Sequence, residues 1–160
     1  MMALDLIRAL AEDASIGVVV TDVAIESPGP IILYANPAFG RLVGRDLDRI
    51  VGQSPRFMQG KETRRETLDA FHRALTAGER FHGYLTNYRS DGIKYRVEID
   101  CRPLRNVSGE LDGFVAFQRE VVRRLGRPAG GSGGRYEASL ISNDPLGDPL
   151  RSLGVFSAED

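Results

Sequence analysis

The sequence has little of what disulfide-rich, metal-binding and membrane-spanning proteins depend on. It contains one cysteine, Cys101, in 160 residues, which excludes an internal disulfide and a cysteine-rich metal site. It also contains only two histidines, His72 and His82, and no carboxylate or cysteine spacing around them indicates a metal site. No apolar run approaches the roughly 20 residues that a membrane-spanning helix needs.

An excess of charge of one sign is also missing. The formal net charge of −1 at pH 7 provides no field that would attract nucleic acid or anionic lipid. The N-terminus lacks the basic-then-apolar order of a secretory signal. We therefore expect a cytoplasmic protein that binds neither nucleic acid nor membranes. No catalytic triad, paired carboxylates or phosphate-binding glycine loop stands out, so we expect no enzyme.

Hydrophobic periodicity in the first half of the chain predicts alternating strands and short helices. An amphipathic spacing indicates a helix over residues 3–13, and β-branched residues indicate strands over residues 16–23 and 31–35. A helix follows, because Asn36 is a good N-cap and the proline after it fits the first helical position. A T-x-x-E capping box at Thr63 predicts the start of a longer helix.

The second half of the chain alternates with a period of two, which is typical of strands. Residues 81–88, 93–102 and 114–118 are the predicted strands. The middle one places apolar residues on one face and charged residues on the other, which is typical of an antiparallel sheet with one face in water. We predict an α+β fold with a five-stranded antiparallel sheet and short helices on one face.

Composition divides the chain into four segments. Residues 1–15 form an amphipathic flanking helix that packs on its own domain or on a second copy, and residues 16–122 form the domain. Residues 123–134 are rich first in arginine and then in glycine, as in a flexible linker. Residues 135–160 are interpreted as a disordered acidic tail, and docking of its apolar residues on a partner is the alternative.

One stretch of residues, 52–60 with the sequence GQSPRFMQG, carries polar side chains that a buried core would not need. It resembles the motif G-x-N-C-R-F-L-Q-G of LOV domains, the flavin-binding blue-light sensors of the PAS family. The resemblance extends over about residues 16–120 and implies the PAS fold with a flavin mononucleotide (FMN) between sheet and helices. Pro55 stands where LOV domains have the cysteine that forms the photochemical adduct with the flavin.

Four residues match the flavin-binding positions of the family. The resemblance implies that Arg56 pairs with the flavin phosphate and that Gln59 contacts the ring or chain oxygens. Asn87 matches the first of two strand amides at the ring edge. Gln118 matches the last-strand glutamine that contacts the flavin and relays its chemical state to the sheet.

Other positions depart from the family pattern. Ser54 offers only a short hydroxyl in place of asparagine, and Val97 replaces the second strand amide. His72 replaces a second phosphate-binding arginine, for which Arg73 beside it is a partial substitute. Each lost polar contact costs about 1–3 kcal/mol of affinity. With Pro55 in the motif, no adduct can form there, and Cys101, the single alternative thiol, is more typical of inert packing.

Two hypotheses therefore remain. The first is a sensory domain that binds a flavin nucleotide without a covalent bond and signals by flavin redox state or photoreduction. The second is a flavin-free interaction module in a signalling pathway, of which one variant would hold another small ligand. In either case the output would pass to a downstream signalling protein, or to a homodimer formed through the leading helix or the sheet face.

Overall fold

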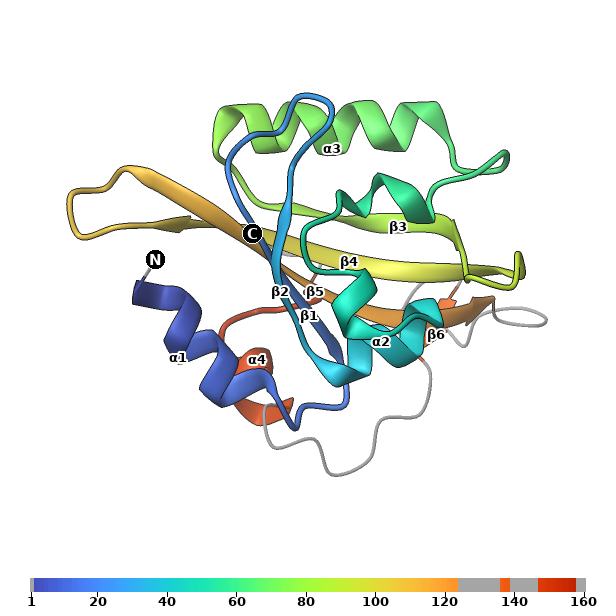
Figure 1. The fold of residues 1–160 in the computed structure, drawn as a ribbon, viewed down its shortest axis with the longest axis horizontal. Coiled ribbons are helices and arrows are strands. Elements are labelled where there is room, and N and C mark those ends of the chain that lie inside the picture. The colour runs from blue at the N-terminus through green and yellow to red at the C-terminus, as the bar shows by residue number, and fades with distance from the viewer. Residues whose placement is uncertain (1, 124–135, 139–146, 158–160) are drawn as a thin grey trace, which may run out of the picture.

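An antiparallel sheet lies at the centre of the fold, with its five main strands in the order β2-β1-β5-β4-β3 (Figure 1). The computed structural model describes residues 2–123, 136–138 and 147–157. The strands are β1 Gly17–Thr21, β2 Ile32–Ala35, β3 Phe81–Tyr88, β4 Lys94–Arg105, β5 Leu111–Arg123 and β6 Tyr136–Ala138. The helices are α1 Met2–Ala11, α2 Pro37–Val43, α3 Arg65–Ala77, α4 Gly147–Ser152 and the 3₁₀ helices η1 Leu47–Arg49 and η2 Pro55–Met58.

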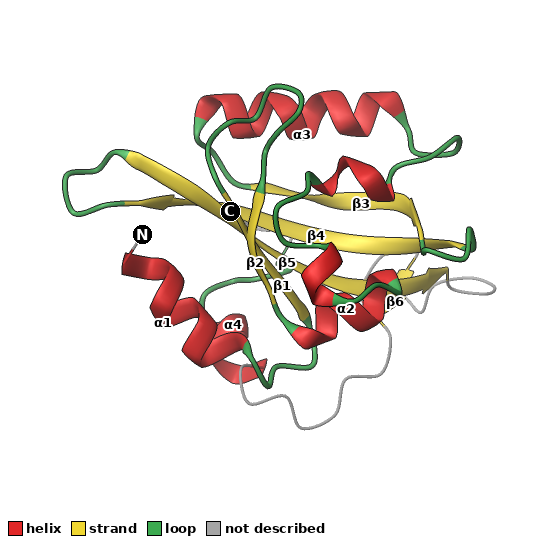
Figure 2. Ribbon diagram, in the orientation of Figure 1, coloured by secondary structure: helices red, strands yellow, loops and turns green. Residues whose placement is uncertain are grey.

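The helices form two layers, one on each face of the sheet (Figures 1 and 2). Helices α2, η2 and α3 cover one face, which we call the pocket face, and α1 and α4 lie against the other, the outer face. This arrangement confirms the predicted α+β fold with its five-stranded antiparallel sheet. Among the helices that the structure describes, none is both long and apolar enough to cross a membrane.

Asn36 joins three elements at the start of α2. Its side-chain oxygen accepts the Phe39 N–H at 3.0 Å, as the predicted N-cap requires, and also the Val18 N–H at 2.9 Å. Its amide nitrogen donates to the carbonyl oxygens of Ala11 and Ile16 at 2.9 Å each. All of this amide's strong hydrogen-bonding directions are used, so the fully buried side chain fixes α1, β1 and α2 relative to one another.

The predicted capping box at Thr63 is wrong. Helix α3 begins at Arg65 with Arg64 as its N-cap, and no side chain makes the capping bond. The Thr63 hydroxyl instead donates to the Thr86 carbonyl at 2.6 Å and accepts the Gly60 N–H at 2.9 Å. A tertiary contact with β3 has therefore replaced the local one, and it ties the approach to α3 to the sheet.

Apolar residues of the pocket face pack against the helices. The Phe71 ring of α3 stacks on the Phe81 ring of β3, with the ring centroids 4.3 Å apart. Phe81 also lies over Gly83, where an added Cβ atom would come within 2.7 Å of the ring. Burial of such side chains contributes about 1.5–3 kcal/mol each and supplies most of the stability of this layer.

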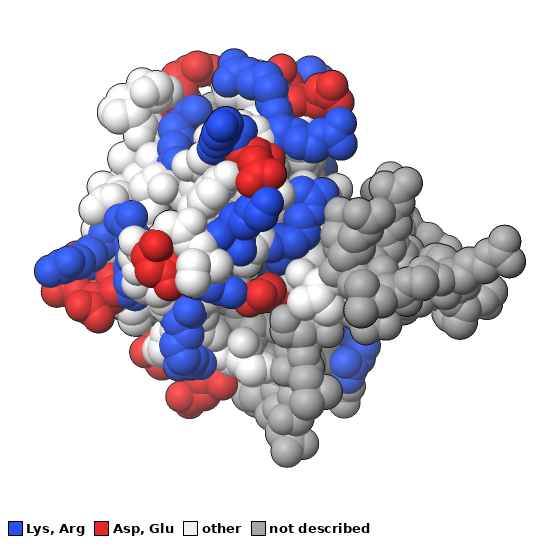
Figure 3. Space-filling view, turned by 90° about the vertical axis from the view of Figure 1, so that its right-hand side faces the viewer, with Lys and Arg blue, Asp and Glu red and all other residues white. Residues whose placement is uncertain are grey.

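Around Glu98 and Asp100 the outer face of β4 is not in water, contrary to the prediction. Glu98 and Asp100 are 3% and 0% exposed, because residues 153–157 return to cover this part of the sheet. His82 on β3 is also largely covered, and its Nε2 lies 2.8 Å from a Glu98 carboxylate oxygen. Elsewhere, basic and acidic side chains are interspersed on the face shown in Figure 3, in keeping with the small net charge.

The described parts of residues 135–160 form a short strand and a short helix, and the predicted disordered tail stays a prediction. β6 pairs with residues 121–123 at the end of β5, beyond the part of β5 that pairs with β1. Leu150 of α4 and Phe156 join the apolar cluster on the outer face. These contacts form because the outer face offers apolar side chains and buried charges that need cover. The remaining residues of the predicted tail, and nearly all of the predicted linker, lie outside the described residues.

Helix α1 packs on its own domain. Leu4, Ile7 and Ala11 contact the outer-face cluster around Val18 and Val115. Leu6 and Leu10 point away from it and are 62% and 55% exposed. The predicted homodimer through this helix stays a prediction.

Candidate flavin site

A cavity with two adjoining compartments lies between the pocket face and the helices. The inner compartment has a volume of about 80 Å³ and is walled by β1, β3, β4, β5, α3 and η2. The outer compartment, of about 400 Å³, lies between the loop that precedes β2, η2 and α3. Both are lined by Pro55, Gln59 and Phe71, so the two compartments share a wall.

Gln118 carries an unsatisfied polar atom in the inner compartment. Its side chain lines that compartment and is 4% exposed. The side-chain oxygen Oε1 has no hydrogen-bond partner among the residues that the structure describes. Its neighbours in the wall include Phe114 and Ala116 of the same strand. An unpaired buried carbonyl costs about 1–3 kcal/mol, so a donor group placed at this atom would be stabilising.

Asn87 is the second amide in the inner compartment. It is 2% exposed, lies on β3, and its side chain hydrogen-bonds the hydroxyl of Tyr95 on β4. Burial raises the pKa of Tyr95 to about 12, and the bond from Asn87 acts in the opposite direction. The phenol therefore stays neutral at physiological pH. Asn87 has one anchored edge, which fixes the orientation of its amide toward the cavity.

Strand alternation explains why these two amides face the same compartment. Asn87 shares a face of β3 with Leu85, and Gln118 shares a face of β5 with Ala116, as the period of two requires. β4 lies between the two strands and adds Ile99, which pairs with Gln118 in the ladder. The sequence predicted these two residues for one site, and the structure brings them to the same compartment.

The stretch that resembles the LOV motif forms the rim between the compartments. Pro55 and Gln59 line both, at the two ends of η2. Ser54 caps η2, since its hydroxyl accepts the Arg56 N–H at 3.4 Å, and it lines only the outer compartment. The hydroxyl of Ser54 thus has a structural partner, and Gln59 is the amide of this stretch that reaches both chambers.

Arg56 binds the loop that precedes β2. Its Nε donates to the Gly29 carbonyl and one Nη to the Ile25 carbonyl, both at 2.9 Å. The guanidinium has five N–H donors, so several remain that no described residue takes up. Arg56 therefore fixes the mouth of the outer compartment and presents positive charge to it, as the predicted phosphate contact requires.

The basic residues of helix α3 that line the cavity differ from those predicted. His72 lines the outer compartment, with its Nε2 3.0 Å from a Glu26 carboxylate oxygen. Arg73 is exposed and lines neither compartment. Arg65 does line the mouth and pairs with Asp69 at 3.2 Å. Arg65 was not among the predicted residues, although its spacing of seven from His72 puts both on one helix face.

Two positions of β4 differ in what they offer a ligand. Val97 is fully buried and lines neither compartment. Cys101 does line the inner compartment. Burial, with the Asp100 charge next to it, raises the pKa of the Cys101 thiol to about 12. This thiol is therefore neutral and a weak nucleophile, because reactivity belongs to the thiolate.

The side chains that line the cavity suit the polar edge of a flavin. The volume of the inner compartment, in contrast, is small for the flavin ring. Amides can meet both the carbonyls and the N–H groups of such an edge. Sites for ligands of this size typically span about 300–1,000 Å³, more than the inner compartment of about 80 Å³. A bound ring would therefore have to extend into the outer compartment. Across residues 2–123, 136–138 and 147–157, no cluster of side chains suits a metal ion.

Comparison with known proteins identifies the family. The PAS domain model matches residues 16–123 of this chain. The chain therefore belongs to the PAS domain family.

Several relatives are much longer than the region that matches this chain. The chain is 36% identical over 112 residues to a nitrogen fixation regulatory protein of Klebsiella oxytoca, covering 70% of this chain and 22% of that protein. It is 33% identical over 100 residues to a blue-light-activated histidine kinase of Brucella anthropi, covering 62% of this chain and 20% of that protein. The chain thus spans about a fifth of the length of these relatives.

Solved structures with the same fold include light-oxygen-voltage domains. The LOV domain of Aureochrome1 in its light state superposes with a TM-score of 0.63 at 33% identity, covering 73% of this chain and 89% of that one. A structure described under "Flavin Analogue Sheds Light on Light-Oxygen-Voltage Domain Mechanism" gives a TM-score of 0.65 at 26% identity, covering 76% and 86%. The chain is thus a PAS domain with LOV domains among its structural neighbours.

Proposed function

We propose that this chain is a sensory domain of the LOV type that binds a flavin nucleotide non-covalently and signals through flavin redox state or photoreduction. One observation carries the proposal: the buried Gln118 Oε1 has no partner among the described residues and lines an apolar cavity together with Asn87. A native fold rarely leaves such an atom unpaired, and a ligand with a donor edge would satisfy it.

The residues that would hold the flavin fall into two groups. Gln118 and Asn87 would bind the polar edge of the ring, and Gln59 lies between ring and chain. Arg56 and Arg65 line the mouth where the phosphate would emerge, with charge of the right sign. When bound, a flavin supplies light absorption and reversible electron transfer.

No thiol is available at the motif position. Pro55 occupies it and lines both compartments. Cys101 is neutral, since burial raises its pKa to about 12. We therefore propose that the domain responds without a covalent flavin adduct, and that Gln118 rather than a cysteine reports the state of the flavin.

The response would leave the site through β5. Gln118 faces the cavity, and the next residue, Arg119, faces the outer side, where its Nε donates to Glu98 at 2.8 Å. Gln118 would hold the polar edge of a bound flavin, and a reversal of the hydrogen bond that its amide makes would be transmitted to β5. Such a change biases a two-state element, and a partner signalling protein or a second copy bound to the outer side or to α1 would read it.

An absorbance spectrum of protein produced with excess riboflavin tests the proposal. We expect the structured blue absorbance band of an oxidised flavin, released on denaturation, and bleaching on illumination with an electron donor. Gln118→Leu should lose most of the flavin, whereas Gln53→Leu, at an exposed position, should retain it. A folded, colourless protein that FMN cannot reconstitute would overturn the proposal.

A flavin-free interaction module is the second candidate function. The small inner compartment, the apolar Val97 and the pairing of His72 with Glu26 favour it. A folded, colourless and self-associating protein is its expected result, and a monomer with tightly bound flavin contradicts it. Neither candidate includes an enzymatic activity.

A further inference from the structure

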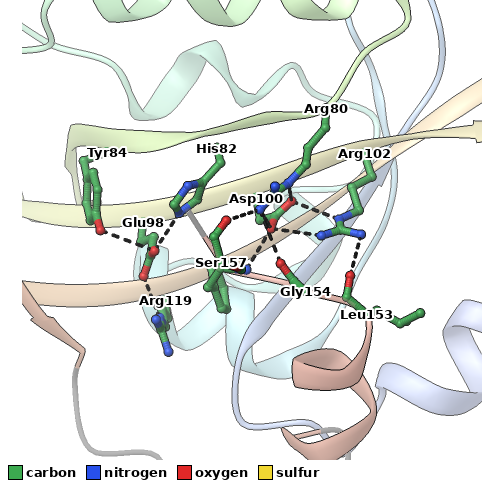
Figure 4. Close-up of polar contacts among 11 residues, drawn as sticks. Arg80, His82, Tyr84, Glu98, Asp100, Arg102, Arg119, Leu153, Gly154 and Ser157 are labelled. Carbon is green, nitrogen blue, oxygen red and sulfur yellow. Dashed lines mark hydrogen bonds and ion pairs between the residues drawn. The ribbon is translucent and has the colours of Figure 1, made fainter. Parts of the chain in front are cut away.

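Two adjacent carboxylates on the outer face of β4 are buried, which is costly unless each is paired. Glu98 accepts from Arg119 at 2.8 Å, and its other oxygen lies 2.8 Å from His82 Nε2. Asp100 accepts two bonds from Arg80, at 3.1 and 2.7 Å, and one from Arg102 Nε at 3.1 Å (Figure 4). Arg80 and Arg102 account for only part of the Asp100 environment.

The Asp100 carboxylate also binds the backbone of the C-terminal segment. The Phe156 N–H donates to Asp100 Oδ2 at 2.7 Å. Burial alone would raise the pKa of Asp100, but the bonds from Arg80, Arg102 and Phe156 outweigh it and the net shift is downward. The carboxylate is thus held charged, as an acceptor for a peptide N–H.

The two arginines that bind Asp100 also donate hydrogen bonds to carbonyl oxygens of the same segment. Arg80 Nη2 donates to the Ser157 carbonyl at 2.6 Å and to the Gly154 carbonyl at 3.4 Å. Arg102 Nη1 donates to the Leu153 carbonyl at 3.0 Å. Figure 4 shows the three carbonyls turned toward the arginines. A fork of donors and one acceptor therefore recognises a bent stretch of main chain.

Side chains at two positions add selectivity. The Arg119 guanidinium lies over the Phe156 ring, 4.2 Å from its centroid, and Val155 is buried. Gly154 and Phe156 have φ angles of +75° and +66°. A left-handed phenylalanine is uncommon, and such a conformation persists only when the surroundings fix it. In contrast, the Leu153 side chain is 66% exposed and makes no demand on the site.

We infer that the outer face carries a peptide-recognition site, formed by Arg80, Asp100, Arg102 and Arg119, and that its occupant is this chain's own segment of residues 153–157. The site takes a bent peptide with glycine, a small apolar residue and an aromatic residue in succession. Intramolecular attachment gives a segment an effective concentration in the millimolar range, so the chain's own segment excludes a free peptide. A site built on backbone contacts will accept the same peptide in trans when the attached segment is weakened.

A fluorescent peptide with the sequence of residues 149–157 tests this inference on the full chain. We expect saturable binding, followed by anisotropy, to the Phe156→Ala chain, and binding to the wild-type chain weaker by about tenfold or more. Leu153→Ala is the matched control, because its exposed side chain lies in the same segment, and it should behave as the wild type. The same peptide with alanine in place of phenylalanine should bind neither chain.

A double variant tests whether the peptide binds at the proposed site. Asp100→Asn combined with Phe156→Ala should lose the binding that Phe156→Ala alone gains. If the folded Phe156→Ala chain does not bind the peptide, or if the double variant binds it equally well, the site is not as assigned. A wild-type dimer that Phe156→Ala dissociates would overturn the assignment of the occupant to the same chain.

Discussion

The two faces of the sheet differ in how their buried polar groups are paired. On the pocket face the buried polar residues Thr21, Asn87 and Gln118 carry no charge, and Gln118 leaves an oxygen unpaired among the described residues. On the outer face the buried groups are charged, and Asp100 is fully paired by arginines and a backbone N–H. The pocket face thus keeps an unpaired acceptor in a cavity, whereas the outer face around Asp100 is covered by the chain itself.

Removal of the Asp100 carboxylate should have the largest effect on stability. Asp100→Ala leaves Arg80 and Arg102 without their shared partner, and we expect a loss of about 2–4 kcal/mol in the free energy of unfolding. Urea denaturation measures it. The control is Glu66→Ala, which breaks an exposed ion pair with Arg64 and should cost less than about 1 kcal/mol. Equal losses in the two variants would contradict the buried pairing.

Removal of the Gln118 amide should have the opposite sign in ligand-free protein. Gln118→Leu replaces an unpaired buried oxygen by methyl groups, so we expect a gain of about 1–2 kcal/mol in the free energy of unfolding. The exposed control Gln53→Leu should change it by less than about 0.5 kcal/mol. A clear loss of stability in ligand-free Gln118→Leu would show that the oxygen has a partner in solution.

The outer face should also give the protein a pH dependence. The pKa of Asp100 is lowered in the folded state, against an ordinary value of about 3.9 in the unfolded chain. Its contribution is therefore complete above about pH 5 and is lost as the pH falls through the folded pKa. Unfolding curves of the wild type and Asp100→Ala should differ by a constant amount above about pH 5 and converge below about pH 4. A difference that widened toward acid would reverse the expected sign.

The smallest effect is expected at Cys101. Because its pKa is raised to about 12, Cys101→Ser should leave the illuminated spectrum of the flavin-loaded protein unchanged. The size of the two side chains is similar, so folding should be retained. Loss of a light-induced spectral change in this variant would show that the thiol takes part in the photochemistry.

The two faces also differ in how far the sequence predicts them. The family resemblance assigned Asn87 and Gln118 to the site, and both face the pocket because a period of two decides the facing of every strand residue. The same alternation indicated a wet outer face around Glu98, since nothing local shows that residues 153–157 come back to cover it. The predicted capping role of Thr63 is wrong for the same reason. Its hydroxyl bonds the carbonyl of Thr86, which lies 23 residues away in the sequence.

The cations at the cavity mouth show the same limit. Arg56 was predicted from the motif, but its bonds to the carbonyls of Ile25 and Gly29 depend on a loop about 30 residues earlier in the chain. Closeness in sequence to His72 favours Arg73, whereas helix geometry turns adjacent residues about 100° apart. Arg65 lies on the correct face, and a test of helix periodicity against His72 would have found it.

Titration of the flavin-free protein with FMN, followed by quenching of flavin fluorescence, tests the central claim most directly. The claim predicts saturable one-to-one binding by the wild type and an affinity at least about tenfold lower for Gln118→Leu, the loss of one strong polar contact. Binding that is absent in the folded wild type, or unchanged in Gln118→Leu, would contradict it.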